Sequence, residues 1–432
     1  MKKPLDFEKE WLKSFPAHWK ICRLKDYTST NTGITFTKAN LVESGNAVLS
    51  YGQIHAKNNI VTEINHELIR FIPDSLIEDK PASKVKSGDF IFADTSEDLN
   101  GCGNCIYVNE SIDLYAGYHT ILLRNKGLDC GKYFAYLFMS DLWRSQIRKK
   151  VKSVKLYSVT QGILNQSFII VPSVAEQEAI AAYLDKECGK IGKEIGLLER
   201  KVDCYRRLRR SLINNVVTRG LNSQVRTKIS EGSLSSIIPF HWEERRVKDI
   251  FTEVSIKGCP NEPMLCATQA KGVILQSMYE NRVVTALTGL ENMKLVEKGN
   301  FVISLRSFQG GIELAYYRGI ISVAYTILKL DEQQEKDFYR YLFKSASFIK
   351  LMKKCVTGIR EGQNINYSIL KYEKIPVPSP YEQREIVTYL DDKCNKIDAI
   401  IKNIESKIEL LKELKRSLIN EVVTGQRAIN TI

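Results

Sequence analysis

Two stretches of the chain carry apolar residues at alternating steps of four and three positions. In the first stretch these residues are Leu184, Cys188, Ile191, Ile195, Leu198, Val202 and Tyr205. In the second they are Leu390, Cys394, Ile397, Ile401, Ile404, Ile408 and Leu411, each 206 positions later. This spacing is typical of the apolar seam of a coiled coil. The pattern therefore predicts two long helices with matching seams.

Start and stop signals flank both stretches. An S-x-x-E capping box precedes each seam, and a glycine follows each one, as expected at the two ends of a helix. The signals are Ser173 with Glu176 and Gly220 for the first helix, and Ser379 with Glu382 and Gly425 for the second. Each helix should run for about 40 residues, or roughly 60 Å at 1.5 Å per residue.

The whole first half of the chain reappears in the second. R-S-L-I-N-x-V-V-T occurs at 210–218 and at 416–424, and P-x-H-W begins at Pro16 and at Pro239. Gln53 corresponds to Gln269, 216 positions later, and Gly88 to Gly299, 211 positions later. The offset falls steadily from 223 at the prolines to 206 at the helices. This internal repeat predicts two domains of one fold that differ in detail.

The predicted fold class is mixed α/β, with two repeated domains flanked by the long helices. Short apolar runs at 89–92 and 300–303 are typical of strands, and 133–148 and 338–353 of helices. The expected segments are a first domain, a first long helix, a polar linker (220–236) with a second domain, and a second long helix, at 1–172, 173–220, 221–378 and 379–432. The helices most simply pack on one another. Packing on their own domains or on a second chain is the alternative.

Composition narrows the function. A chain of 432 residues with 44% hydrophobic residues is long enough for two or three cores, which excludes a single small module. Lysine and arginine number 63 against 50 acidic residues, so the net charge of +13 favours an anionic partner. No apolar run approaches the roughly 20 residues that span a bilayer, and we expect a cytoplasmic protein. The ten scattered cysteines should be free thiols.

Basic residues cluster before each long helix, and polar residues suited to base edges follow them. One cluster is most simply a solvated face, but its recurrence in a divergent repeat favours phosphate binding. The DNA-binding candidates of the first half are Arg144, Arg148, Lys149, Lys150, Lys152, Lys155, Ser158, Thr160 and Gln161. Those of the second half are Arg306, Gln309, Lys350, Lys353, Lys354, Arg360, Gln363, Asn364 and Asn366, with Lys344 in the same basic cluster.

Catalytic and metal-binding motifs are weak. Asp74, Glu78 and Lys80 loosely resemble a metal-dependent nuclease pattern, but the acids are too close together and the second half has no copy. Cys102 and Cys105 form a lone C-x-x-C without the four spaced ligands of a structural zinc site. We therefore expect neither a catalytic residue nor a metal ligand here.

The arrangement as a whole resembles the specificity subunit of type I restriction-modification systems. The resemblance rests on P-S-x-x-E-Q (172–177 and 378–383) at the start of each long helix and on R-S-L-I-N-x-V-V-T at its end, and it covers essentially the whole chain. His18 and His241 stand where glycine is common in the family. The resemblance implies two target recognition domains that each read half of a bipartite site in double-stranded DNA, with an antiparallel helix pair between them.

The resemblance also implies partners. A specificity subunit is not an enzyme; it recruits two modification subunits that methylate adenine and two restriction subunits. S-adenosylmethionine, ATP and Mg²⁺ would belong to those partners, so no cofactor is expected on this chain. The exposed helix residues expected to dock the modification subunits are Arg206, Arg207, Arg209, Lys412, Lys415 and Arg416.

Two alternatives from other classes remain. One is a stand-alone nuclease that acts through Asp74, Glu78 and Lys80. The other is a coiled-coil scaffold whose domains bind protein. The target sequence, its spacer length and the domain that reads each half-site are not encoded in any recognisable pattern.

Overall fold

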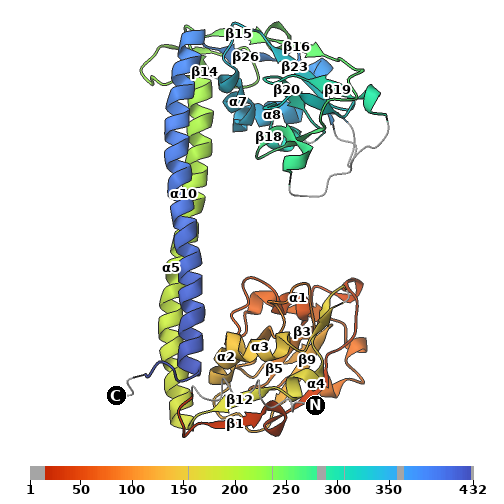
Figure 1. Ribbon diagram of the computed structural model, residues 1–432, viewed down its shortest axis with the longest axis vertical. Helices are drawn as coiled ribbons and strands as arrows, with labels where there is room; N and C mark the ends of the chain where they lie inside the picture. Colours follow the sequence, from red (N-terminus) through yellow and green to blue (C-terminus); the bar gives the residue numbers. More distant parts are fainter. Residues whose placement is uncertain are drawn as a thin grey trace. The chain divides into compact units, whose positions relative to one another are not determined.

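The computed structural model describes residues 15–153, 155–235, 237–279, 289–305, 307–357 and 364–429 (Figure 1). The chain divides into two units: residues 1–198 with 406–432, and residues 199–405. Each unit contains one α/β domain and parts of two long helices, α5 (Val174–Arg219) and α10 (Pro380–Val423). Both predicted long helices are present, and Gly220 (φ +76°) and Gly425 (φ +70°) follow their ends in the left-handed conformation.

The first domain is built around a four-stranded antiparallel sheet in the order β2-β9-β5-β7. Smaller sheets have the orders β4-β3-β8, β10-β11-β6 and β1-β12, and only β3 and β8 pair in parallel. The strands are β1 (Lys20–Arg23), β2 (Thr28–Thr32), β3 (Asn46–Leu49), β4 (Arg70–Ile72), β5 (Phe90–Ala93), β6 (Thr95–Ser96), β7 (Cys105–Tyr107), β8 (Leu114–Ala116), β9 (Thr120–Asn125), β10 (Lys152–Ser153), β11 (Tyr157–Ser158) and β12 (Phe168–Val171).

The second domain repeats this plan. Its four-stranded sheet has the order β16-β23-β20-β21, and β15 pairs with β26 as β1 pairs with β12. The strands are β15 (Glu243–Arg246), β16 (Phe251–Val254), β17 (Leu265–Thr268), β18 (Gly272–Leu275), β19 (Lys294–Val296), β20 (Phe301–Ile303), β21 (Glu313–Leu314), β22 (Gly319–Ile321), β23 (Thr326–Leu330), β24 (Val356–Thr357), β25 (Asn364–Ile365) and β26 (Lys374–Val377). The predicted mixed α/β repeat is confirmed.

Each helical stretch that the sequence predicts as one element is two helices. In the first domain α2 (Gly131–Met139) ends at Ser140 and α3 (Asp141–Arg148) begins there. The Ser140 hydroxyl accepts from the N–H of Trp143 and donates to the carbonyl of Leu137, so it both ends one helix and caps the next. Ser345 does the same between α7 (Lys336–Lys344) and α8 (Ala346–Lys354). The short helices α1 (Tyr51–Ile54), α4 (Gln161–Asn165), α6 (Ser307–Gly310) and α9 (Tyr367–Leu370) complete the helices of the domains.

The segment predicted as a plain linker is partly folded. Strand β13 (Thr227–Ile229) lies within it and pairs antiparallel with β14 (Ile237–Pro239), which begins directly after it. The Phe240 ring packs under the Arg226 guanidinium, whose carbon lies 4.6 Å from the ring centre. The polar composition of this segment concealed the short strand β13, whose sequence Thr-Lys-Ile carries no apolar pattern.

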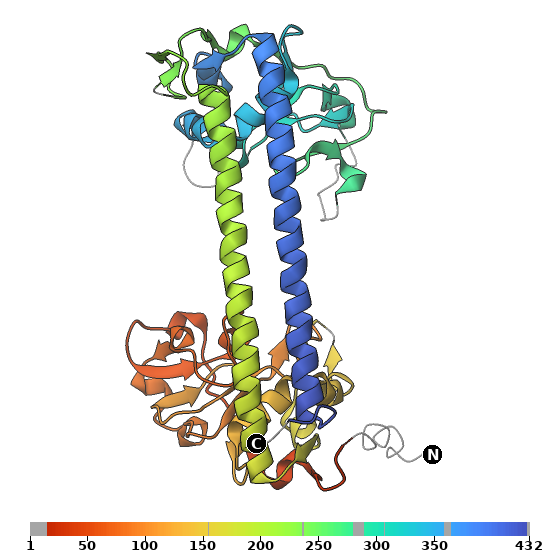
Figure 2. The same ribbon diagram turned by 90° about the vertical axis from the view of Figure 1, so that its left-hand side faces the viewer.

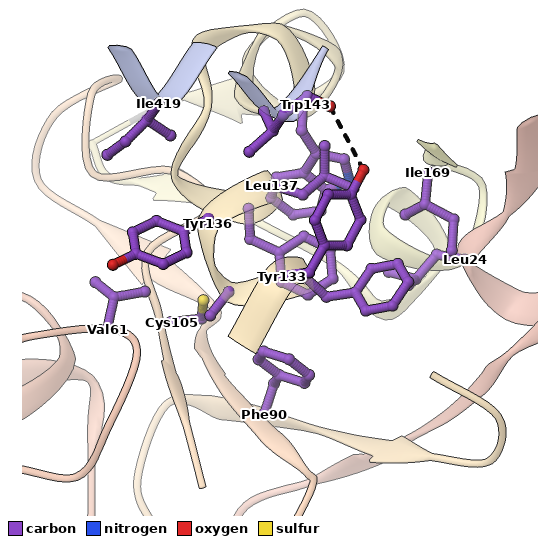
Figure 3. Close-up of a cluster of buried hydrophobic side chains, with 14 of the residues drawn as sticks. Leu24, Val61, Phe90, Cys105, Tyr133, Tyr136, Leu137, Trp143, Ile169 and Ile419 are labelled. Atoms are coloured by element: carbon purple, nitrogen blue, oxygen red, sulfur yellow. Dashed lines mark hydrogen bonds between the residues drawn. The ribbon is translucent and has the colours of Figure 1, made fainter. Parts of the chain in front are cut away.

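The two cores repeat each other at the level of aromatic pairs. Phe90 of β5 meets Phe138 of α2 edge to face, with ring centres 5.1 Å apart. Figure 3 shows Phe90 among the other side chains of this core. Phe301 of β20 meets Phe343 of α7 in the same way and at the same distance. All four rings are fully buried. Such pairs contribute about 0.5–1.5 kcal/mol beyond the area they bury, so each sheet is fastened to its helix by the same contact.

Each domain core takes in one end of the other domain's helix. In the first unit Leu418, Ile419 and Val422 of α10 belong to the core of the first domain (Figure 3). In the second unit Ile213 and Val217 of α5 belong to the core of the second domain. A domain is therefore packed against the start of the helix that follows it and against the end of the other helix.

The helices also pack on each other inside each unit, as the seam predicts (Figure 2). Leu184 and Cys188 are buried in the first unit, as are Leu390 and Cys394 in the second. Ion pairs cross between the helices, Glu194 with Lys407 in the first unit (2.7 Å) and Arg209 with Asp398 in the second (3.0 Å). Within the second unit Arg206 pairs with Glu405 and Arg209 pairs with Asp398, so the partner's number falls as the position along α5 rises, and the helices are antiparallel there. Among the described residues, no helix combines the length and apolar character needed to cross a membrane.

Candidate nucleic-acid interface

Glu176 at the start of α5 anchors the N-terminal turn of the first domain. Its carboxylate accepts from the Trp19 indole N–H (3.0 Å), pairs with His18 (2.7 Å) and accepts from the Ser173 hydroxyl. Burial raises the pKa of Glu176, but the hydrogen bonds from His18, Ser173 and Trp19 outweigh it and hold that pKa at about 2. The glutamate is therefore an anion at the positive end of the helix.

The second unit repeats this anchor. Glu382 accepts from the Trp242 indole N–H and pairs with His241, both at 2.9 Å. The histidines that depart from the family pattern are thus each bound to a helix-start glutamate. Because the same three side-chain types meet twice, the P-x-H-W and E-Q motifs are explained by packing, and neither needs a role in DNA binding.

The glutamine after each glutamate fixes the adjoining domain helix. Gln177 is fully buried; it accepts from the N–H of Cys130, just before α2, and donates to the carbonyl of Pro172. Gln383 accepts from the N–H of Glu335, just before α7, and donates to the carbonyl of Pro378. Each buried amide thus satisfies the carbonyl that follows the last strand of the domain and the N–H that precedes a domain helix. These two hydrogen bonds set the orientation of the domain on its long helix.

The first domain carries a polar hollow of about 620 Å³, called here the first hollow. It lies where α1, the loop after β6 and the turn before β11 come together, and Tyr51, His55, Asp98, Asn100, Asn104 and Leu156 are among its lining residues. His55 is held on both sides, since Nε2 lies 2.8 Å from the Thr95 carbonyl and Nδ1 lies 3.0 Å from the Asn104 amide. The hollow is thus lined by preorganised hydrogen-bonding groups.

The second domain carries an equivalent hollow of about 690 Å³, the second hollow. Its lining includes Thr268, Gln269, Lys271, Ser304, Gln309 and Glu313. At the offset of 216 found for Gln53, His55 corresponds to Lys271, and Asp98 and Gln309 lie in the segments that follow β6 and β20. The two domains therefore keep the same hollow and fill it with different chemistry.

Two arginines of the predicted basic cluster are turned inward. Arg144 donates from Nε to the Phe138 carbonyl (2.9 Å), and Arg148 donates from Nη2 to the Asn100 carbonyl (3.2 Å) and pairs with Asp141 (3.4 Å). Burial lowers the pKa of Arg144. These contacts compete directly with the phosphate binding that the sequence predicts for both residues.

The other candidates of the first half surround the hollow. Ser158 of β11 pairs with Thr95 of β6, which lines the first hollow, and Thr160 caps α4. The Gln161 amide oxygen accepts from the Thr30 hydroxyl (3.1 Å). The side chains that lie exposed on this surface are Lys149, Lys150, Lys152, Lys155 and Ser158. The fold thus brings residues 150–158 to the same edge as residues 95–101.

In the second half, Lys350, Lys353 and Lys354 lie exposed on α8, which packs against α6, the short helix that contains Gln309. Asn366 caps α9 through the N–H of Ser368. Arg306, Arg360 and Gln363 lie outside the described residues, as does the side chain of Asn364. The role of these four residues stays a prediction.

The helix residues expected to dock a partner are mostly engaged in ion pairs. Arg206 pairs with Glu405 (2.7 Å) and Arg209 with Asp398 across the helix pair, and Arg416 pairs with Asp141 (3.1 Å). Lys412 pairs with Glu409, three positions earlier on the same helix. Arg207 contacts the Cys204 sulfur, and Lys415 is half-buried. Their expected role in docking is not tested by these contacts.

The weak motifs are accounted for locally. The Asp74 carboxylate accepts from the Asn46 amide (2.6 Å), and Glu78 and Lys80 are exposed. Cys102 and Cys105 are buried, and burial raises the pKa of Cys105 to about 12. All ten cysteines are free, as predicted. In the described part of the chain, no three His, Cys, Asp or Glu side chains are grouped so that they could hold a metal ion.

The hollow residues are what sequence reasoning missed. Tyr51, His55, Asn104 and Lys271 belong to no recognisable motif. The one available signal was the match between Gln53 and Gln269, which marks the equivalent segment beside each hollow. Only the fold brings that segment next to the loops that follow β6 and β20.

Comparison with known proteins identifies the family. The family described as "Type I restriction modification DNA specificity domain" matches twice, at residues 16–195 and 239–410. A specificity subunit assigned to the type I restriction enzyme MjaX of Methanocaldococcus jannaschii is 22% identical, over 99% of this chain and 97% of its own. The EcoKI specificity subunit of Escherichia coli is 20% identical, over 95% of this chain and 89% of its own.

A solved chain shares the fold. It comes from work described as the structural basis of complex assembly and conformational transition of the type I R-M system. It superposes with a TM-score of 0.67 at 16% sequence identity, and the match covers 96% of this chain and 99% of that chain. Together with the two family matches, which cover most of the sequence, this agrees with the resemblance seen in the helix motifs. The chain belongs to the type I restriction-modification DNA specificity family.

Proposed function

We propose that this chain reads a bipartite site in double-stranded DNA, with one half-site for each domain. The observation that carries the proposal is the pair of equivalent hollows with different linings. The first presents the His55 imidazole where the second presents the Lys271 ammonium, and Asp98 lines the first hollow whereas Gln309 and Glu313 line the second. Because base edges in the major groove differ in their donors and acceptors, two such linings favour two different half-site sequences.

Exposed lysines beside each hollow would supply affinity. Lys152 and Lys155 border the first hollow, and Lys353 and Lys354 lie on α8 close to the second. Lysines bind phosphates without regard to sequence and release counterions, so affinity should fall steeply with salt. In this arrangement the lysines hold the duplex and the hollows choose the sequence.

We also propose that the chain acts through partners and is not itself an enzyme. Two modification subunits would dock on exposed parts of α5 and α10, including Arg206, Arg207, Arg209, Lys412, Lys415 and Arg416, and two restriction subunits would complete the assembly. S-adenosylmethionine, ATP and Mg²⁺ would be bound by those subunits. The exposed Leu208 and Leu414, which occupy equivalent positions on the two helices, support a repeated docking surface.

Methylation mapping of the host genome, with and without this gene, tests the proposal. Loss of adenine methylation at one gapped motif on deletion is the expected result. Exchange of residues 1–172 for those of a relative should then change one half of that motif and leave the other intact. An unaltered motif after the exchange would contradict the one-domain, one-half-site arrangement.

A nuclease assay separates the enzyme alternative. If the purified chain cleaves DNA with Mg²⁺ and Asp74→Ala abolishes the cleavage, catalysis belongs to this chain after all. The scaffold alternative predicts that the chain binds one duplex no better than scrambled competitors.

A further inference from the structure

We infer that Arg144 and Arg148 in the first domain, and Lys344 in the second, are positioning residues that hold the loops lining the hollows. They belong by sequence to the basic clusters, yet their charged groups face the protein. The inference rests on the proposed function, because it explains how each hollow keeps its base-reading side chains in place.

Lys344 is the clearest case. Its ammonium group donates to the carbonyls of Gln269 (3.1 Å) and Gly310 (2.9 Å) and pairs with the carboxylate of Glu313. Glu313 is almost fully buried. An ammonium group has three N–H donors, and these three acceptors use all of them. Lys344 therefore has no donor left for a phosphate.

The two carbonyls that Lys344 binds belong to two separate segments, each of which contributes residues to the lining of the second hollow. Gln269 belongs to the turn between β17 and β18, and Gly310 ends α6, directly after Gln309. One side chain at the end of α7 thus ties together the two segments that carry Gln269 and Gln309. Loss of this tie would let the two amides move independently.

The first domain reaches the same result with two arginines. Arg144 (3.5 Å) and Arg148 (3.2 Å) both donate to the carbonyl of Asn100, which lines the first hollow. Asn100 follows Asp98, whose carboxylate accepts from the N–H of Gly101 (2.7 Å) and closes the loop. The loop that presents Asp98 is therefore fastened from behind by α3.

Close backbone contact repeats in the two domains. Gly103 has φ +92°, and a Cβ there would lie 3.6 Å from the Arg144 Cγ and 3.2 Å from the Trp143 ring. Gly311 has φ +97°, and a Cβ there would lie 3.0 Å from the Lys344 Cδ and 2.4 Å from the Phe343 carbonyl oxygen. In both domains a glycine lets the loop that follows the hollow pass directly against the basic side chain.

Selection of bound duplexes from a randomised library, followed by titration with salt, tests the inference on the full chain with its co-expressed partners. Lys344→Met removes the charge, and Lys353→Met, on the exposed face of α8, is the matched control. We expect Lys344→Met to flatten base preference at one half-site by roughly tenfold, about the worth of one good base contact, while the salt slope stays unchanged. Lys353→Met should keep both half-sites and reduce the slope by about 0.9.

Other outcomes are equally decisive. If Lys344→Met keeps both half-sites and loses about 0.9 of slope, Lys344 binds phosphate and the inference is wrong. If the wild-type chain selects no two-part motif, the proposed function itself fails, and the inference fails with it. If Lys344→Met does not fold, two further variants test the inference. Lys344→Arg should alter base preference at the same half-site although it keeps the charge. Arg148→Met should alter base preference at the other half-site. Unchanged preference in both of these folded variants would also overturn the inference.

Discussion

Asn420 near the end of α10 holds the first N–H of α3: its side-chain oxygen accepts from the backbone of Asp141 at 2.7 Å, and its amide donates to the Asp141 carboxylate at 3.1 Å. Asn214 near the end of α5 accepts from the N–H of Ser347 in α8 at 2.8 Å. The asparagine of R-S-L-I-N is therefore the link between the end of a long helix and the second helix of a domain. The motif that identifies the family is thus a packing motif.

Replacement of Asn214 by alanine should lower the free energy of unfolding of the second unit by about 1 kcal/mol, because it leaves a half-buried helix-start N–H without its acceptor. Asn215→Ala, one position along and exposed, is the control and should change stability by less than about 0.5 kcal/mol. Denaturant unfolding of both variants makes the comparison. Equal effects would mean that the Asn214 contact contributes nothing specific.

Glu176→Gln should destabilise the first unit by about 1–2 kcal/mol at neutral pH, since it weakens a helix cap and charge-assisted hydrogen bonds. The pKa of Glu176 is held at about 2 in the folded protein and is near 4.3 when unfolded. Because the pKa of Glu176 is lower in the folded state, its ionised form stabilises the folded protein at pH values above the unfolded pKa. This stabilisation is lost as the pH falls toward 2. The difference between wild type and variant should therefore be constant from pH 7 to about 5 and shrink below it.

Thermal melts at several pH values measure this difference. Leu197→Ala, at an exposed and uncharged site on the same helix, serves as a control whose effect should not change over the pH range in which Glu176 titrates. A gap between wild type and Glu176→Gln that grows on acidification would contradict the assignment.

Removal of the exposed lysines should weaken DNA binding equally for all sequences. Each of Lys150→Ala, Lys152→Ala and Lys155→Ala should reduce the slope of log affinity against log salt by about 0.9, because each removes one phosphate contact. Fluorescence anisotropy at 50–200 mM salt, with specific and scrambled duplexes, gives both numbers. If a variant loses affinity only for the specific duplex, that lysine reads bases instead.

Cysteine labelling should follow burial. Cys204 is exposed on α5, whereas Cys102, Cys105 and Cys355 are buried. Burial raises the pKa of Cys105 to about 12 and that of Cys355 to about 11, so neither is a thiolate at pH 8. Brief alkylation of the native chain, read by peptide mass spectrometry, should modify Cys204 first. Early modification of Cys105 would show that the first domain opens in solution.

Periodicity and repetition determined most of the fold in advance. The steps of four and three placed Leu184 and Leu390 at buried seam positions, and the repeat predicted that two domains would share one plan. These features are legible because a helix seam depends on local spacing, and a repeat doubles every local signal. The break at Ser140 and the strand β13 inside the linker were missed, because a serine cap and a short polar strand barely disturb the apolar pattern.

Only the tertiary structure decided the direction in which each basic side chain points. By sequence, Arg148, Lys344 and Lys353 are equivalent members of two basic clusters. In the folded protein Lys353 faces solvent, whereas Arg148 and Lys344 are bound to carbonyls from segments distant in sequence. Charge and helix position are local properties, but the acceptors at Asn100, Gln269 and Gly310 come into reach only when the loops fold back on α3 and α7. Composition thus predicts an anionic partner, and long-range packing decides which basic side chains stay exposed to solvent.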